Sequence, residues 1–193
     1  MKEMPLFPLH AVLFPGGELR LRVFEPRYLA MVRDCTAGNR VFGVCQISDG
    51  HEVGAPATPA SFGTTARIVD FNVDPQGLLG IVVEGVQRFH VRQVRIRDTG
   101  MVVAEVELLE ETSSNLRAEH SLLASLLDKI LEQAGGKHAK APPRMFDSAP
   151  WVGYRLAELL PLDNDQRQGL LQCSCPHQRL SMLLQWVPKL TRE

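Results

Sequence analysis

The hydrophobic pattern changes its period near Leu109, and this change constrains the fold more than any other feature. Before Leu109 apolar and polar residues alternate, as in residues 18–23, which places the apolar side chains on one side of an extended strand. After Leu109 the apolar residues recur at the three- and four-residue spacing of helices. Strands followed by helices predict an α+β chain with two domains, residues 1–110 and 111–193.

The first part contains several short alternating segments separated by turns rich in Gly, Asp and Pro. Strands are expected at residues 18–23, 40–47, 65–73, 78–83, 86–96 and 101–108. Gly85 interrupts the alternation and the inward phase changes near Gln93, so β-bulges are expected at both places. The pattern predicts a mostly antiparallel β-barrel with one inserted helix, which Pro26 would begin and Gly38 would end.

The second part carries signals for four helices. Residues 113–115 offer N-caps for a long helix that Gly135 would stop, and Ser148 offers a cap for the next helix. The pair Asp163 and Gln166 has the spacing of a capping box. A last helix is expected from Pro176, ended or kinked at residue 188, so this part is predicted to be an α-helical bundle.

Charge and hydropathy exclude several classes of protein. The formal net charge of −1 gives the whole molecule no electrostatic attraction to nucleic acid or anionic membranes. No apolar run reaches the roughly 18 residues needed to cross a bilayer, and the start lacks the pattern of a signal peptide. We therefore expect a cytoplasmic protein with no membrane partner and with its four cysteines reduced.

Motifs for catalysis are not found in the sequence. Residues 136–138, Gly-Lys-His, lack the earlier glycine and the Ser or Thr of a phosphate-binding loop. No motif ties a serine to a lysine as in a serine-lysine peptidase. The sequence therefore predicts no enzyme, no catalytic residue and no cofactor.

A possible metal site lies at Cys173, Cys175 and His177, since thiolates and imidazoles bind zinc. A tetrahedral site needs a fourth ligand, and ligands separated by a single residue make a cramped chelate. We favour a junction between two helices at this place and expect no metal.

Four arginines, Arg88, Arg92, Arg95 and Arg97, put positive charge on one strand segment. They could contact phosphates, or they could form the solvated face of an antiparallel strand. No aromatic side chain that could stack on a base shares their face, so the solvated face is favoured.

Three segments near the amino terminus are specific enough to indicate a family. Residues 5–9 (PLFPL), 12–16 (VLFPG) and 19–28 (LRLRVFEPRY) resemble the opening of the Lon protease amino-terminal, substrate-binding domain, in its stand-alone bacterial form without ATPase or peptidase domains. Further similar segments follow in the family's order, at residues 42–44, 63–68, 85–89, 159–162 and 168–171. The resemblance implies a PUA-like barrel followed by a helical bundle.

The same resemblance implies a function. In full-length Lon proteases this region precedes an ATPase ring and a peptidase and helps to capture damaged or unfolded substrates. We therefore expect a non-catalytic module that recognises unfolded or extended polypeptide or a specific client protein, as an adaptor or weak holdase in protein quality control. The alternative is an RNA-binding PUA-like protein, although the charge gives no reason to expect nucleic acid.

The candidate peptide-binding residues lie where a strand passes into the inserted helix. They are Phe24, Glu25, Arg27 and Tyr28, a cluster of large and charged side chains. An exposed apolar groove or an unpaired strand edge there could hold a peptide with little sequence preference. The alternative is structural: Glu25 and Arg27 would pair at the barrel mouth, and Phe24 and Tyr28 would belong to the core.

Overall fold

The computed structural model describes residues 2–73 and 75–190, and the side chains of residues 3–73 and 75–187. The chain divides into two compact units, Met1–Glu110 and Glu111–Glu193, called here the first and the second unit. Each is described by itself below.

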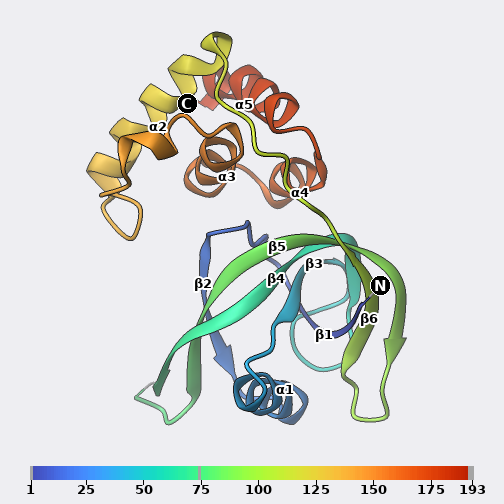
Figure 1. Cartoon of the computed structure of the whole chain (residues 1–193). Helices are drawn as coiled ribbons and strands as arrows, with labels where there is room; N and C mark the ends of the chain where they lie inside the picture. Colours follow the sequence, from blue (N-terminus) through green and yellow to red (C-terminus); the bar gives the residue numbers. More distant parts are fainter. Residues whose placement is uncertain (1, 74, 191–193) are drawn as a thin grey trace. The chain divides into compact units, whose positions relative to one another are not determined.

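The first unit is built on six strands that form one closed sheet (Figure 1). The strands are β1 (Lys2–Leu9), β2 (Glu18–Val23), β3 (Phe42–Asp49), β4 (Thr58–Val73), β5 (Leu79–Ile96) and β6 (Val102–Leu108). Their order is β2-β5-β4-β3-β1-β6, and β6 also pairs with β5, so the sheet closes into a barrel. Among the described residues only β1 and β3 pair in parallel, which confirms the predicted, mostly antiparallel barrel.

Strand β1 was not among the strands expected from the alternation, because it contains Pro5 and Pro8. Proline has no N–H for a ladder and argues against a central strand. The structure resolves the conflict by changing partners along β1: residues 2–5 pair with β6 and residues 6–9 with β3. Each half of β1 therefore uses only one of its two edges in the sheet.

Strand β5 is continuous through Gly85, where the sequence predicted a break between two strands. Both predicted bulges are confirmed, because the pairing register shifts between Gly85 and Arg88 and again between Val91 and Gln93. At Gly85 the strand passes close to another segment: an added Cβ would lie 2.2 Å from the carbonyl oxygen of Phe14. Only glycine allows this approach.

The inserted helix α1 (Pro26–Ala37) packs at one end of the barrel (Figure 1). It begins at Pro26 and is capped by Gly38, as predicted. One side of the helix enters the main core cluster of the unit. The buried residues of that side are Tyr28, Met31, Val32 and Cys35. Barrel and helix thus share one core, which fixes the residues at the start of α1.

The second unit is helical, as predicted. It contains α2 (Ser121–Ala134), α3 (Ala149–Leu159), α4 (Asn164–Gln172) and α5 (Pro176–Leu190), with short 3₁₀ helices at Ala118–His120 and Pro143–Met145. The Ser148 hydroxyl accepts from the amide of Trp151 at 3.4 Å, and the Asp163–Gln166 capping box is complete. Helix α5 continues to Leu190, so Pro188 does not end it.

The predicted start of the first long helix was wrong. Residues 113–115 do not cap α2, which begins at Ser121. Asn115 instead forms an isolated β-bridge with Ser148, and the carbonyl of Ser114 accepts from the amide of Ala149 at 3.0 Å. A Ser-Ser-Asn segment caps a turn as readily as a helix, and here a tertiary contact decides.

Arg179 of α5 is a buried cross-link within the second unit. Its Nε donates to the carbonyl of Leu170 at 3.1 Å, Nη2 to that of Cys173 at 2.7 Å, and Nη1 to the Glu111 carboxylate at 3.2 Å. The guanidinium also stacks 4.0 Å from the ring centroid of Tyr154. Every nitrogen of this buried cation therefore has an acceptor.

None of the helices within residues 2–73 and 75–190 combines the length and apolar character needed to cross a membrane.

Candidate functional site

The four candidate peptide-binding residues surround the start of α1 but face different ways. Tyr28 is buried, with its ring centroid 4.1 Å from that of Phe7 in an edge-on contact, and burial raises the pKa of its hydroxyl. Glu25 and Arg27 form an ion pair at 2.9 Å. Phe24, by contrast, keeps 47% of its surface exposed. The structural alternative thus describes three of the residues, whereas Phe24 is an aromatic side chain outside the core.

A small hollow, called here the β2 groove, lies beside this cluster. Its volume is about 210 Å³. It is lined by Phe7, Leu9, Arg20, Leu21, Arg22, Phe24, Glu25, Tyr28, Glu52 and Val53. Three of the four candidate residues therefore line one groove, and Arg27 does not. Glu52 is held there because its carboxylate accepts from the main-chain amide of His10 at 2.6 Å.

Strand β2 forms one wall of this groove and stands at the end of the strand order. Within the described part of the chain its only strand partner is β5. Leu19 and Leu21 pack towards the core, while Arg20 and Arg22 are exposed, which confirms the alternation seen in the sequence. Residues of β2 and of the end of β1 line the groove together, so β2 borders a hollow.

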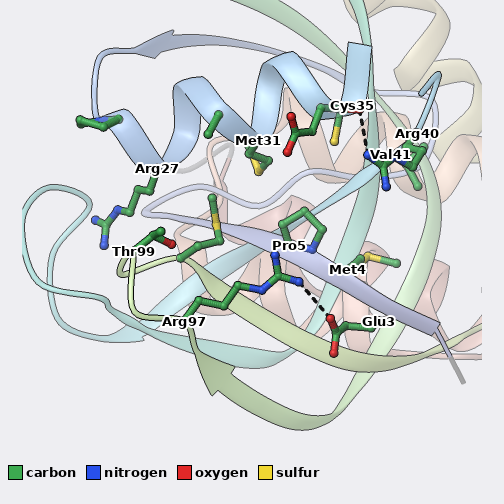
Figure 2. Close-up of a pocket in the computed structure, with 14 residues that line it drawn as sticks. Glu3, Met4, Pro5, Arg27, Met31, Cys35, Arg40, Val41, Arg97 and Thr99 are labelled. Carbon is green, nitrogen blue, oxygen red and sulfur yellow. Dashed lines mark hydrogen bonds and ion pairs between the residues drawn. The ribbon is translucent and has the colours of Figure 1, made fainter. Parts of the chain in front are cut away.

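A larger hollow, the α1 pocket, lies between α1, the start of β1 and the β5–β6 turn (Figure 2). Its volume is about 700 Å³. It is lined by Glu3, Met4, Pro5, Pro26, Arg27, Ala30, Met31, Asp34, Cys35, Arg40, Val41, Arg97, Thr99 and Met101. Sequence reasoning missed this pocket apart from Arg27, because its walls come from four separate segments that only the barrel closure brings together.

The floor of the α1 pocket is apolar and its rim is charged. Met4, Met31 and Met101 are all more than nine-tenths buried. Burial raises the pKa of the Cys35 thiol, against the opposing effect of the nearby positive charge of Arg40. A neutral thiol and three thioethers thus make a soft, adaptable surface.

The charged groups of the rim are mostly engaged. Arg97 donates to the Glu3 carboxylate at 3.0 Å. Arg40 donates to the main-chain carbonyl of Asp34 at 3.1 Å, a bond that caps the end of α1. Arg27 donates through Nη1 to the carbonyl of Gly100 at 3.0 Å, but its buried Nε has no acceptor among the residues that the structure describes.

The arginines of β5 need one correction. Arg92, Arg95 and Arg97 are exposed, as the solvated-face interpretation predicts, but Arg88 is buried, with 2% of its surface exposed. The bulge between Gly85 and Arg88 changes the inward phase, so Arg88 lies inside together with its neighbour Phe89.

The exposed arginines of β5 and Arg97, which directly follows it, face carboxylates. Arg92 pairs with Glu107, and Arg95 and Arg97 both pair with Glu3. This side of the strand is therefore a mixed-charge surface.

The cysteine pair lies between α4 and α5, which confirms the predicted helix junction. The Cys173 thiol contacts the carbonyl of Cys175 at 3.4 Å, and His177 stacks on His120 with ring centroids 5.8 Å apart. Within residues 2–73 and 75–190, no three His, Cys, Asp or Glu side chains are grouped so that they could hold a metal ion.

The sequence and the fold have clear relatives. The family model of the ATP-dependent protease La (LON) substrate-binding domain matches residues 3–189, nearly the whole chain. The chain belongs to this family. The family predicted from the amino-terminal motifs is therefore confirmed, and the residues around α1 belong to a Lon substrate-binding domain.

Solved Lon domains share this fold. The Lon N-terminal domain protein from Xanthomonas campestris is 46% identical, with a TM-score of 0.82 over 96% of this chain and 99% of that chain. The N-terminal domain of the Mycobacterium avium complex Lon protease has a TM-score of 0.71 over 96% of this chain and 97% of that chain. At 16% identity the second likeness concerns the fold alone.

Curated relatives are much longer proteins. Lon protease 2 of Myxococcus xanthus is 26% identical over 191 residues, which cover 94% of this chain and 23% of that protein. Protein cereblon of Danio rerio is 31% identical over 115 residues, or 58% of this chain and 26% of that protein. This Lon substrate-binding domain thus spans about a quarter of the length of these relatives.

Proposed function

We propose that this chain is a non-catalytic recognition module that binds unfolded or extended polypeptide by adding it as a strand to the edge of β2 that faces away from β5. The observation that carries the proposal is the position of β2 at the end of the strand order, beside a groove with an exposed phenylalanine. The family supports the proposal, since it is that of the Lon substrate-binding domain.

Strand addition suits a ligand without a fixed sequence. Main-chain hydrogen bonds supply affinity that does not depend on side chains, and a pocket beside the edge selects one side chain of the peptide. The β2 groove, at about 210 Å³, is smaller than the roughly 300–1,000 Å³ of sites that enclose a whole small molecule. We infer that it takes a single large apolar side chain.

The exposed apolar groups of the groove would be covered by such a ligand. Phe24 and Val53 are 47% and 56% exposed, so neither side chain is buried in the core. An aromatic ring at a groove is a common anchor because it offers a large apolar area with little side-chain freedom to lose. Phe24 is therefore the residue on which the proposal depends most.

The charge around the groove favours polypeptide over nucleic acid. Arg20, Arg22, Glu25 and Glu52 all line the groove, so both signs of charge are present. The exposed arginines of β5 also face carboxylates, and no observation favours the alternative of RNA binding. In a cell, the proposed module would act in the cytoplasm as an adaptor or weak holdase for client proteins.

The experiment compares two phenylalanines of equal exposure. Phe24 and Phe71 are both 47% exposed and both belong to the first unit, but only Phe24 lines the groove. Binding of a fluorescent, reduced and carboxymethylated protein that cannot refold would be followed by anisotropy. Phe24→Ser should weaken binding roughly tenfold, the loss typical of an anchor residue, and Phe71→Ser should leave it unchanged.

Equal affinities of the two variants would contradict the proposal. A salt titration of the same complex separates the RNA alternative, because phosphate binding weakens steeply with salt whereas apolar strand addition does not.

A further inference from the structure

We infer that the α1 pocket binds a carboxylate that carries an apolar body, such as a free medium-chain acid or the apolar carboxyl terminus of a polypeptide. The site is separate from the β2 groove, and the inference does not rest on strand addition there. Its volume of about 700 Å³ lies within the roughly 300–1,000 Å³ typical of sites that enclose a small ligand.

The apolar body would lie on the methionine floor. Met4, Met31 and Met101 come from β1, α1 and the start of β6, and all three side chains border the pocket. Unbranched thioether side chains adapt to ligands of different shape, so a floor of this kind selects apolar character rather than one outline. Figure 2 shows Met31 and Pro5 on opposite sides of the hollow, between α1 and β1.

The carboxylate would meet Arg27. The side chain of Arg27 is 7% exposed, and it lines the pocket. Its Nη1 and Nη2 donate to Gly100 and Glu25, but Nε is buried without an acceptor in the described residues. A buried N–H of a cation that lacks an acceptor is costly, so a small turn of the Arg27 side chain that gives this donor to a ligand oxygen in the pocket would be favourable.

The surrounding charge also favours an anion. The pocket is lined by three arginines and two carboxylates, and each of those carboxylates is shared with an arginine outside the pocket. Arg95 pairs with Glu3, and Arg33 pairs with Asp34 at 3.1 Å. Arg27 also lies in the first turn of α1, where the helix dipole favours negative charge.

Methionine methyl NMR tests this site directly, using decanoate as the probe. The full chain would be labelled at its methionine methyl groups and titrated with decanoate. We expect shifts for Met4, Met31 and Met101 and none for Met145 and Met182, which belong to the second unit and act as an internal reference. Decanol should bind roughly tenfold more weakly, because it keeps the apolar chain and loses the charge-assisted hydrogen bond.

Variants then test the arginine. Arg27→Gln should reduce decanoate affinity roughly tenfold and leave decanol affinity unchanged. Arg92→Gln, an exposed arginine of the same unit that lines neither hollow, should change neither. If Arg27→Gln does not fold, the decanoate and decanol titrations of the unaltered chain still decide the question.

Two peptides identify the source of the carboxylate. A short peptide with apolar last residues and a free carboxyl terminus is compared with the same peptide as its amide. Tighter binding of the acid, with shifts at the three pocket methionines, supports a polypeptide terminus as the ligand, and binding of decanoate alone supports a free acid. Equal binding of decanoate and decanol, or no shift at the pocket methionines with any acid, would overturn the inference.

Discussion

Two buried arginines, one in each unit, show how differently the units use the same side chain. Arg179 of the second unit stacks on Tyr154, and each of its nitrogens has an acceptor within the unit. Arg27 of the first unit lies 4.8 Å from the ring centroid of Tyr28, yet its Nε has no acceptor in the described chain. All nitrogens of Arg179 are used in holding helices together, whereas Arg27 has one donor left beside a pocket.

The same difference holds for the surroundings of the two side chains. Arg179 fixes the end of α4 and the junction before α5, so its contacts are structural. Arg27 lines the α1 pocket, and it also pairs with Glu25, which lines the β2 groove. We therefore propose that the first unit carries recognition and that the second unit is a separately folding domain.

Removing Arg179 should have the largest effect. Arg179→Met removes the Arg179 donors to the Glu111 carboxylate and to two carbonyls, and breaking a buried pair of this kind costs about 3–5 kcal/mol of unfolding free energy. Both tryptophans, Trp151 and Trp186, belong to the second unit, so their fluorescence in urea reports the stability of that unit alone. The expected result is a large loss of its stability.

The exposed Arg92 supplies the control, since Arg92→Met should change the unfolding free energy by less than about 1 kcal/mol. Amide signals of the first unit should persist when Arg179→Met unfolds the second. Simultaneous loss of both sets of signals would contradict the proposal of two separately folding domains.

Gly85→Ala should destabilise the first unit by about 1–3 kcal/mol, because its methyl group would meet the Phe14 carbonyl in a packed strand crossing. Amide hydrogen exchange along β5 measures this loss. Apart from its chain neighbours and the backbone of α4, no atom of the described residues lies within 4 Å of a Cβ added at Gly169, which makes that glycine the matched control. Gly169→Ala should instead stabilise the second unit by about 0.5–1 kcal/mol, and equal effects of the two substitutions would show that the close approach at Gly85 is not limiting.

A smaller effect of pH is expected on the stability of the second unit. Burial lowers the pKa of His120 below its ordinary value of 6.5, helped by the neighbouring His177 and Arg117 and opposed by Glu119. The unfolded chain therefore binds a proton more readily, so stability is fully present above about pH 6.5 and declines as the pH falls below it. Urea unfolding at a series of pH values should show this decline in the native chain and a weaker one in His120→Gln.

An unchanged slope in His120→Gln would mean that other groups cause the dependence.

The strands, the barrel and most helices could be predicted because local signals agree with the tertiary structure. Glu18–Val23 alternates as a strand should, and Asp163 caps α4 as its spacing indicates. Strand β1 could not be found from alternation, because it contains prolines. They are tolerated because β1 changes its partner strand along its length, and only the structure shows this change.

The candidate site was predictable in part for the same reason. The passage from strand to helix indicated a cluster of large and charged side chains at residues 24–28. Which of these side chains is exposed depends on how α1 packs on the barrel. The α1 pocket has no sequence signature, since its methionines are separated by tens of residues and become neighbours only when the sheet closes. The burial of Arg88 likewise follows from a bulge. The sequence indicates where this bulge lies, but not which side chains it turns inward.

The central claim is that the edge of β2 receives an extended polypeptide, and hydrogen exchange with mass spectrometry tests it most directly. The full chain would be measured with and without the unfolded, carboxymethylated client. We expect new protection of alternate amides in residues 19–23, those that do not face β5, and no new protection in α2. Protection confined to the second unit, or none in β2 at a saturating client concentration, would contradict the account.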